Sequence, residues 1–147
     1  DNKMGKVNII FWSGTGNTAA MAEYIRQGVE EAGGEAQVIP VGTASVADAE
    51  SVKALALGCP SMGAEQLEEG EMEPYMCDIE GVISGKQVVL FGSYGWGNQE
   101  WMRDWEARIQ SVGATVINGE GIAVNGAPTP DIEEACKDAG RTLASLS

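Results

Sequence analysis

The segment VNIIFWSGTGNT, residues 7–18, decides what kind of fold this chain can form. Residues 7–12 are apolar at nearly every position, as expected for a strand that is covered on both faces. A glycine-rich turn follows, and from Thr18 apolar residues recur at the spacing of a helix up to Ala32. A strand, a glycine turn and a helix in direct succession predict the first βα unit of a parallel sheet.

The same alternation of apolar runs and helical segments continues along the rest of the chain. Gly33 and Gly34 end the first helix, because glycine tolerates the positive φ of a helix C-terminus. Further strands are expected at residues 35–41, 54–59 and 87–93, and a fifth at 115–117 that resumes at 122–124. Further helices are expected at 44–52 (short and polar), 74–79 (one turn), 99–112, and from the N-cap Thr129 and Pro130 onward.

Right-handed crossovers then give an α/β fold, a doubly wound five-stranded parallel sheet with helices on both faces. In such a sheet, ligands bind beyond the carboxyl ends of the strands, at the switch point of the winding order. We therefore expect the loops after the first, third and fourth strands to carry the site. The length fits one domain over residues 6–147, with residues 1–5 read as a tag remnant or ragged start.

The first of these loops, residues 13–18, has the composition of a phosphate cradle. Its glycines let successive backbone N–H groups point inward, and the start of the following helix adds partial positive charge. It has no Lys or Arg, and Asn17 stands where a nucleotide-hydrolysing P-loop needs Lys. The alternative is a glycine turn that only connects two elements, but three hydroxyl residues in six positions favour phosphate.

The loop after the fourth strand, residues 92–97, places Tyr94 and Trp96 between three glycines. Aromatic side chains at a strand tip are hard to explain as core packing, because an exposed indole loses burial unless something flat covers it. The alternative is that Trp96 folds back onto a neighbouring helix. Trp101 and Trp105, at i and i+4 of the next helix, are expected on its inner face, so Trp96 is the candidate ligand contact.

Three segments in this order resemble the flavodoxin family, and the match looks closest to its short-chain clostridial type. They are SGTGNT at 13–18, GCPSMG at 58–63 and FGSYGWG at 91–97, within a similarity that runs from Lys6 to the C-terminus. The resemblance implies an FMN cofactor, with its phosphate in the first loop and its ring between the other two. The implied cofactor contacts are Ser13, Gly14, Thr15, Gly16, Asn17, Thr18, Pro60, Ser61, Met62, Gly63, Ala64, Glu65, Ser93, Tyr94, Gly95, Trp96 and Gly97.

The resemblance also implies individual roles. Trp96 would stack on one face of the flavin ring and Met62 would touch the other, although a methionine after a strand is more often a flexible core filler. Glu65 would bond the N3 edge of the ring, and backbone N–H groups near Gly95 would bond its pyrimidine end. In the family, residues 62–65 form a turn whose central peptide flips with redox state, and Gly63 supplies the positive φ of a type II′ turn.

Two positions depart from the pattern expected of the short-chain clostridial type. Pro60 cannot donate a hydrogen bond, so a phosphate contact that some relatives make from this position is lost. Ala64 stands where some relatives carry Asp, which removes one negative charge beside the flavin. Five glutamates follow closely: Glu65, Glu68, Glu69, Glu71 and Glu73. We expect them to disfavour full reduction of the flavin by charge repulsion and to dock electropositive redox partners; the alternative is a solvated surface.

The chain has no His, and its three cysteines, Cys59, Cys77 and Cys136, form no Cys-x-x-Cys. Imidazole-based catalysis is therefore excluded, and zinc or iron–sulfur sites are disfavoured, so redox chemistry has to come from a cofactor. Cys59 is expected to serve packing. The predicted function is low-potential one-electron transfer on non-covalent FMN, with no catalytic or metal-binding residues and no substrate of its own.

Two other functions fit the same fold. An FMN-dependent NAD(P)H:quinone-type reductase needs a substrate pocket over the flavin, but Trp96 would cover the ring there. A receiver-type signalling module needs clustered Asp at the end of the first strand, where this chain has Trp12 and Ser13. An electron carrier explains all three loops.

The chain is strongly acidic, because nine Lys and Arg stand against 22 Asp and Glu, giving a net charge of −13. Such a charge predicts electropositive redox proteins as donor and acceptor, and it disfavours nucleic acids and anionic membranes. No apolar run is long enough to span a membrane. We expect a cytoplasmic protein, and we expect a monomer because a freely diffusing carrier would be one.

Overall fold

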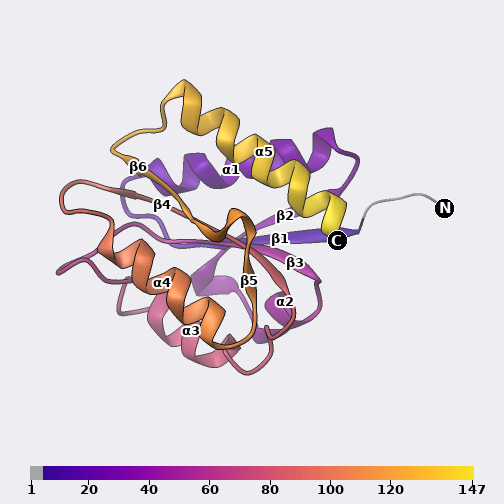
Figure 1. Ribbon diagram of the computed structural model, residues 1–147, viewed down its shortest axis with the longest axis horizontal. Coiled ribbons are helices and arrows are strands. Elements are labelled where there is room, and N and C mark those ends of the chain that lie inside the picture. Colours follow the sequence, from indigo (N-terminus) through magenta and orange to yellow (C-terminus); the bar gives the residue numbers. More distant parts are fainter. Residues whose placement is uncertain (1–4) are drawn as a thin grey trace.

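The computed structural model describes residues 5–147 and shows a parallel sheet between two layers of helices (Figure 1). The strand order is β2-β1-β3-β4-β5, with every pairing parallel. The strands are β1 (Lys6–Phe11), β2 (Glu35–Pro40), β3 (Ala54–Gly58), β4 (Gln87–Tyr94), β5 (Thr115–Val116) and β6 (Ile122–Asn125). This order confirms the predicted doubly wound fold.

The fifth strand position is filled by two consecutive segments, as the sequence indicates. Both β5 and β6 pair with β4, the first at Gln87 and Val88 and the second from Phe91 to Tyr94. A 3-10 turn separates them, and Asn118 within it has a φ of 65°. Ile117, expected at the end of β5, belongs to this turn.

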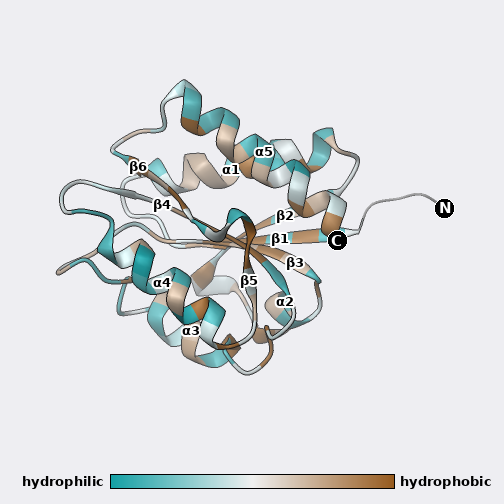
Figure 2. Ribbon diagram, in the orientation of Figure 1, coloured by the Kyte–Doolittle hydropathy of each residue, from teal (hydrophilic) through white to brown (hydrophobic). Residues whose placement is uncertain are grey.

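The strands present alternate side chains to two separate cores, as parallel strands with both faces covered must. Val7, Ile9 and Phe91 pack against α1 (Asn17–Glu31) and α5 (Pro130–Leu146). On the other face, Ile10 and Leu90 pack with residues of α2 (Val46–Glu50), α3 (Met72–Ile79) and α4 (Glu100–Ser111). Figure 2 shows the apolar residues concentrated in the central strands.

Three local predictions about helix ends can be compared with the structure. Thr129 Oγ1 accepts from the N–H of Ile132 and caps α5, as predicted. The helix expected at 44–52 is shorter, since a capping box between Ser45 and Asp48 starts it at Val46. The single turn expected at 74–79 is wrong in extent, because α3 begins at Met72. No helix in residues 5–147 is long and apolar enough to cross a membrane.

Candidate functional site

The loops after β1, β3 and β4 meet at the carboxyl edge of the sheet, because these three strands are neighbours in it. Together they surround a cleft of about 300 Å³. A cleft of this size at the switch point of a doubly wound sheet is the expected place for a cofactor. The residues that line it are Trp12, Gly14, Thr15, Asn17, Pro60, Ser61, Met62, Ser93, Tyr94, Gly95 and Gly126.

The first loop presents free backbone donors. Ser13 Oγ accepts from the N–H groups of Gly16 and Ala19, at 3.2 and 3.3 Å, and so holds the loop in its curve. Within residues 5–147, no acceptor bonds the N–H groups of Gly14, Thr15, Asn17 and Thr18. These groups lie at the N-terminus of α1, where the helix dipole favours an anion. The loop therefore has the donors of a phosphate site without any cationic side chain.

Two hydroxyl groups join the first loop to the third. Thr18 Oγ1 lies 3.2 Å from Ser93 Oγ and accepts from the Ser93 N–H at 3.4 Å. Thr18 is 1% exposed, so its hydroxyl is not among the groups that line the cleft. The side chain of Thr18 fixes the relative position of the two loops, and only its N–H remains for a ligand.

The second loop forms a wider turn than the sequence predicts. The N–H and carbonyl groups of Met62 and Gln66 exchange two hydrogen bonds of 2.8 and 2.9 Å, so three residues lie between the paired positions. The hydrogen-bonded pair thus closes at Gln66, one residue after Glu65, where the predicted turn ends. Gly63 has the predicted positive φ, 52°, but Glu65 also has one, 55°. Met62 lines the cleft, as its predicted role requires.

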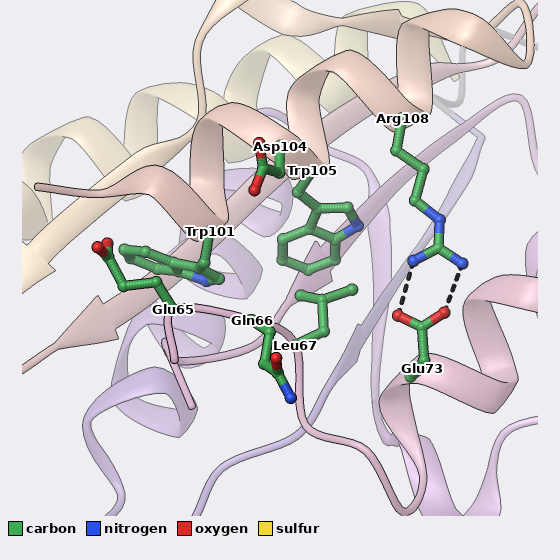
Figure 3. Close-up of a pocket in the computed structure, with 8 residues that line it drawn as sticks. All are labelled: Glu65, Gln66, Leu67, Glu73, Trp101, Asp104, Trp105 and Arg108. Carbon is green, nitrogen blue, oxygen red and sulfur yellow. Dashed lines mark hydrogen bonds and ion pairs between the residues drawn. The ribbon is translucent and has the colours of Figure 1, made fainter. Parts of the chain in front are cut away.

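Glu65 points away from the cleft, toward the start of α4. Its Oε1 accepts from the N–H of Glu100 at 2.8 Å, and its oxygens lie 2.7 Å from where a Cβ on Gly97 would stand. Glu65 lines a second, smaller cavity of about 150 Å³. Figure 3 shows Glu65 beside Trp101, with Trp105 further along the cavity. A helix N-terminus is a favourable partner for a carboxylate. Glu65 thus joins the second loop to the third in this structure.

The third loop exposes its tryptophan, whereas the two tryptophans of the following helix, α4, are buried. Trp96 is 63% exposed, whereas Trp101 and Trp105 are each 1% exposed, which confirms their predicted packing on the inner face of α4. Trp101 Nε1 donates to the carbonyl of Cys59 at 3.0 Å. The structure therefore does not fold Trp96 back as a core residue, and its face is open at the tip of the loop.

The predicted site residues divide between the cleft and its surroundings. Nine of the predicted positions line the cleft directly. Ser13 and Gly16 border an adjoining groove, Gly63 a shallow hollow beside the second loop, and Glu65 the cavity of Figure 3. Ala64, Trp96 and Gly97 lie on exposed or partly exposed loop tips.

Two lining residues were missed. Trp12 ends the first apolar run immediately before the cradle, and Gly126 follows the last strand at the same edge of the sheet. Gly126 donates to the carbonyl of Tyr94 at 2.9 Å with a φ of 75°. The signal for Gly126 was its place after a strand, since the carboxyl ends of all parallel strands share one edge.

The acidic residues after the second loop are not equivalent. Glu68 caps α3, and although burial favours its neutral form, hydrogen bonds from Met72, Glu71 and Gly70 N–H outweigh this and lower its pKa. Two hydrogen bonds of 2.7 Å from Arg108 lower the pKa of Glu73. Figure 3 shows this Arg108–Glu73 pair at one side of the small cavity.

Two of the three cysteines are packed inside the protein, and Cys77 is exposed. Cys59 and Cys136 are fully buried, and burial raises the pKa of each thiol to about 12. A thiol with such a pKa stays protonated near neutral pH and is a poor nucleophile. The packing role predicted for Cys59 agrees with this. Among residues 5–147, no cluster of His, Cys, Asp and Glu side chains could hold a metal ion.

The fold and the cleft together define a small α/β protein whose first loop offers the donors that a phosphate-bearing ligand requires. The sequence profile of the flavodoxin family matches residues 9–140, and the chain belongs to that family. It is 44% identical to the flavodoxin of Megasphaera elsdenii over 138 residues, 94% of this chain and 98% of that protein. It is 43% identical to the flavodoxin of Clostridium beijerinckii over 141 residues, 95% of this chain and 100% of that protein.

A solved structure supports the same relationship. The solution structure of two-electron reduced Megasphaera elsdenii flavodoxin superposes with a TM-score of 0.85 at 43% sequence identity, covering 95% of this chain and 98% of that one. These relatives confirm the predicted short-chain clostridial type. Flavodoxins are FMN-binding electron carriers and not enzymes, so the predicted function and cofactor are confirmed and the reductase alternative is not favoured.

Proposed function

We propose that the cleft between the three loops holds FMN and that the protein passes single electrons at low potential between electropositive redox proteins. The observation that carries this proposal is the set of free backbone N–H groups at Gly14, Thr15, Asn17 and Thr18 beside the cleft. Four neutral donors at a helix N-terminus fit a phosphate, and FMN ends in one. FMN itself supplies the one-electron chemistry when bound.

The chain's own residues would then bind and enclose the cofactor. The first loop, with Ser13 and Gly16 shaping its curve, holds the phosphate. Met62 and Trp96 are the apolar contacts for the two faces of the ring, and Pro60, Ser61, Tyr94 and Gly95 form the walls between. Glycines at 63 and 97 take positive φ and let the second and third loops turn sharply around the ring.

The role proposed for Glu65 involves a competition. To bond the N3 edge of the ring, its carboxylate has to give up the Glu100 N–H, which it accepts at 2.8 Å. Ala64 and Gly63 are exposed and leave this turn free to rearrange. The bond to N3 remains a prediction, and the bond to Glu100 is the arrangement that the structure shows.

The charge of the protein supports the choice of partners. A net charge of −13 accelerates encounter with positively charged proteins and repels nucleic acid and anionic lipid. We further propose that the domain spans residues 6–147, acts as a monomer and works in the cytoplasm, as a freely diffusing carrier would. Sedimentation equilibrium would test the monomer directly.

A visible absorption spectrum, recorded during stepwise anaerobic reduction of the purified protein, tests the proposal. We expect a yellow flavin spectrum that passes through a stable one-electron stage with new absorbance at long wavelength. Direct bleaching, together with steady oxidation of NAD(P)H, would instead support the reductase. A colourless protein that does not take up added FMN would contradict the assignment of the three loops.

A further inference from the structure

A second groove adjoins the cofactor cleft on the outer side of the phosphate loop. It has a volume of about 570 Å³ and shares Trp12, Gly14 and Thr15 with the cleft. Its far wall is formed by residues 40–42, which follow β2. A ligand chain that continues outward from the phosphate loop would enter this groove, because the two spaces meet at Gly14 and Thr15.

Glu71 crosses this groove. Trp12 Nε1 donates to Glu71 Oε1 at 3.2 Å, and the other carboxylate oxygen lies so close to Gly42 that a Cβ there would overlap it. The side chain of Glu71, which immediately precedes α3, therefore lies between Gly42 in the loop after β2 and the indole of Trp12 beside the phosphate loop. Among residues 5–147, it is also the one ionisable side chain that lines the groove, and no Lys or Arg of this part of the chain lines it. The described lining of the groove is therefore negatively charged.

We propose that Glu71 makes the site selective for a flavin mononucleotide over a flavin dinucleotide. This inference rests on the proposed placement of FMN in the adjoining cleft. A mononucleotide ends at its phosphate, which the free N–H groups of the first loop can hold. A dinucleotide has a second phosphate, carrying about one charge, and an adenosine that must continue into the groove.

Two physical effects oppose the dinucleotide. The second phosphate would face the Glu71 carboxylate, and no cationic side chain in the described lining of the groove would offset the repulsion. The adenosine would also have to displace the Glu71 side chain from Trp12 and Gly42. Because Glu71 is exposed, water screens its charge. We expect the charge alone to change the preference for FMN over FAD, as a ratio of dissociation constants, by about three- to fivefold at low salt. The steric effect adds to it.

Three variants separate these effects. Glu71→Gln keeps an acceptor for Trp12 Nε1 and removes the charge, whereas Glu71→Ala removes both the charge and the obstruction. Trp12→Phe removes the N–H that holds the carboxylate in place. Glu69→Gln is the matched control, because Glu69 is an exposed carboxylate two residues away that accepts from Gln66 Nε2 and does not line the groove.

The measurement is the dissociation constant of each apoprotein for purified FMN, FAD and riboflavin, obtained by calorimetry at low and at moderate salt. We expect the wild-type protein to prefer FMN over FAD. The preference should fall about three- to fivefold in Glu71→Gln at low salt, and further in Glu71→Ala. Trp12→Phe should lower it too. Glu69→Gln should keep the wild-type ratio, and riboflavin affinity should change less than twofold in Glu71→Gln.

The results distinguish this inference from the proposed function. Wild-type protein that binds FMN and FAD equally would overturn the role of Glu71. So would an unchanged FMN-to-FAD ratio in both Glu71 variants, provided that circular dichroism shows both to be folded. Wild-type protein that binds no flavin would instead contradict the assignment of the cleft itself.

Discussion

Glu68 accepts hydrogen bonds from the N–H of Met72, the first residue of α3, and from those of Gly70 and Glu71 just before it. The next residue, Glu69, accepts from the side chain of Gln66 and from no other donor within residues 5–147. Glu71 bonds an indole, and Glu73 bonds a guanidinium. The same side chain thus serves as helix cap, surface group, groove wall and ion-pair partner within a few residues. Composition alone describes these glutamates as one acidic run, and only their contacts separate them.

The cap formed by Glu68 gives a prediction about stability and pH. Glu68→Ala should lower the free energy of unfolding by about 1–2 kcal/mol at pH 7, because three N–H groups lose their acceptor. Since the folded-state pKa of Glu68 is lowered, its contribution is present above its unfolded pKa of about 4.3 and is lost as pH falls through the folded value. Urea denaturation at pH 7 and pH 3 would measure both effects.

Glu69→Ala is the control for this prediction. Its carboxylate is exposed and bonds no backbone N–H among residues 5–147, so its removal should change stability by less than about 0.5 kcal/mol. Equal losses in the two variants, or a loss in Glu68→Ala that does not shrink toward acid pH, would show that the cap is not what stabilises α3.

Replacing Trp96 should affect the binding of FMN but not the stability of the fold. The side chain is 63% exposed, so Trp96→Ala should change the stability of the apoprotein by less than about 0.5 kcal/mol. If the indole stacks on the flavin, FMN affinity should fall roughly tenfold or more, because both burial and aromatic contact are lost. Unchanged FMN affinity would contradict the stacking. Trp101→Ala should do the reverse and mainly reduce stability, since Trp101 is 1% exposed.

At the scale of elements, α1 and α5 approach each other through glycine. A Cβ on Gly28 would overlap the carbonyl of Lys137, and a Cβ on Gly140 would overlap the carbonyl of Ile25. This close contact seats α1, whose N-terminus carries the phosphate loop, against the sheet and α5. The geometry of the cradle therefore depends on helix packing at a distance from it.

Gly28→Ala and Gly140→Ala should each destabilise the protein by about 2–3 kcal/mol, because backbone atoms in a well-packed interface cannot easily move aside. Gly81→Ala is the matched control, since a Cβ there would meet no atom within 4 Å and it should be neutral or slightly stabilising. Thermal unfolding of the three apoproteins would decide. If Gly28→Ala were as stable as Gly81→Ala, the close approach would be unnecessary for the fold.

The helices and strands could be predicted from the sequence where neighbouring residues determine them. Apolar runs specified the strands, and the Thr129 cap and the glycines after α1 specified helix ends. The contacts that sequence reasoning missed join distant residues, such as Glu65 to Glu100 across 35 positions and Trp12 to Glu71 across 59. Such pairs follow from which loops meet at the sheet edge, and a single sequence does not encode that register locally.

At the scale of the whole molecule, charge should control the rate of encounter with partners. With a net charge of −13, electron transfer to an acceptor protein of net positive charge should be fast at low salt. The second-order rate constant should then fall roughly tenfold or more between about 10 and 300 mM ionic strength, because salt screens charges beyond about 8 Å. Stopped-flow mixing of the reduced protein with such an acceptor measures this.

The control for this experiment is an acceptor protein of similar redox potential but net negative charge. Its rate constant should rise with salt, since screening then removes a repulsion. Parallel slopes for the two acceptors would show that the 22 acidic residues act only on solubility and that docking depends on the loop tips alone. Opposite slopes would show that the acidic surface selects partners by charge, which is how a carrier with no substrate of its own can discriminate between proteins.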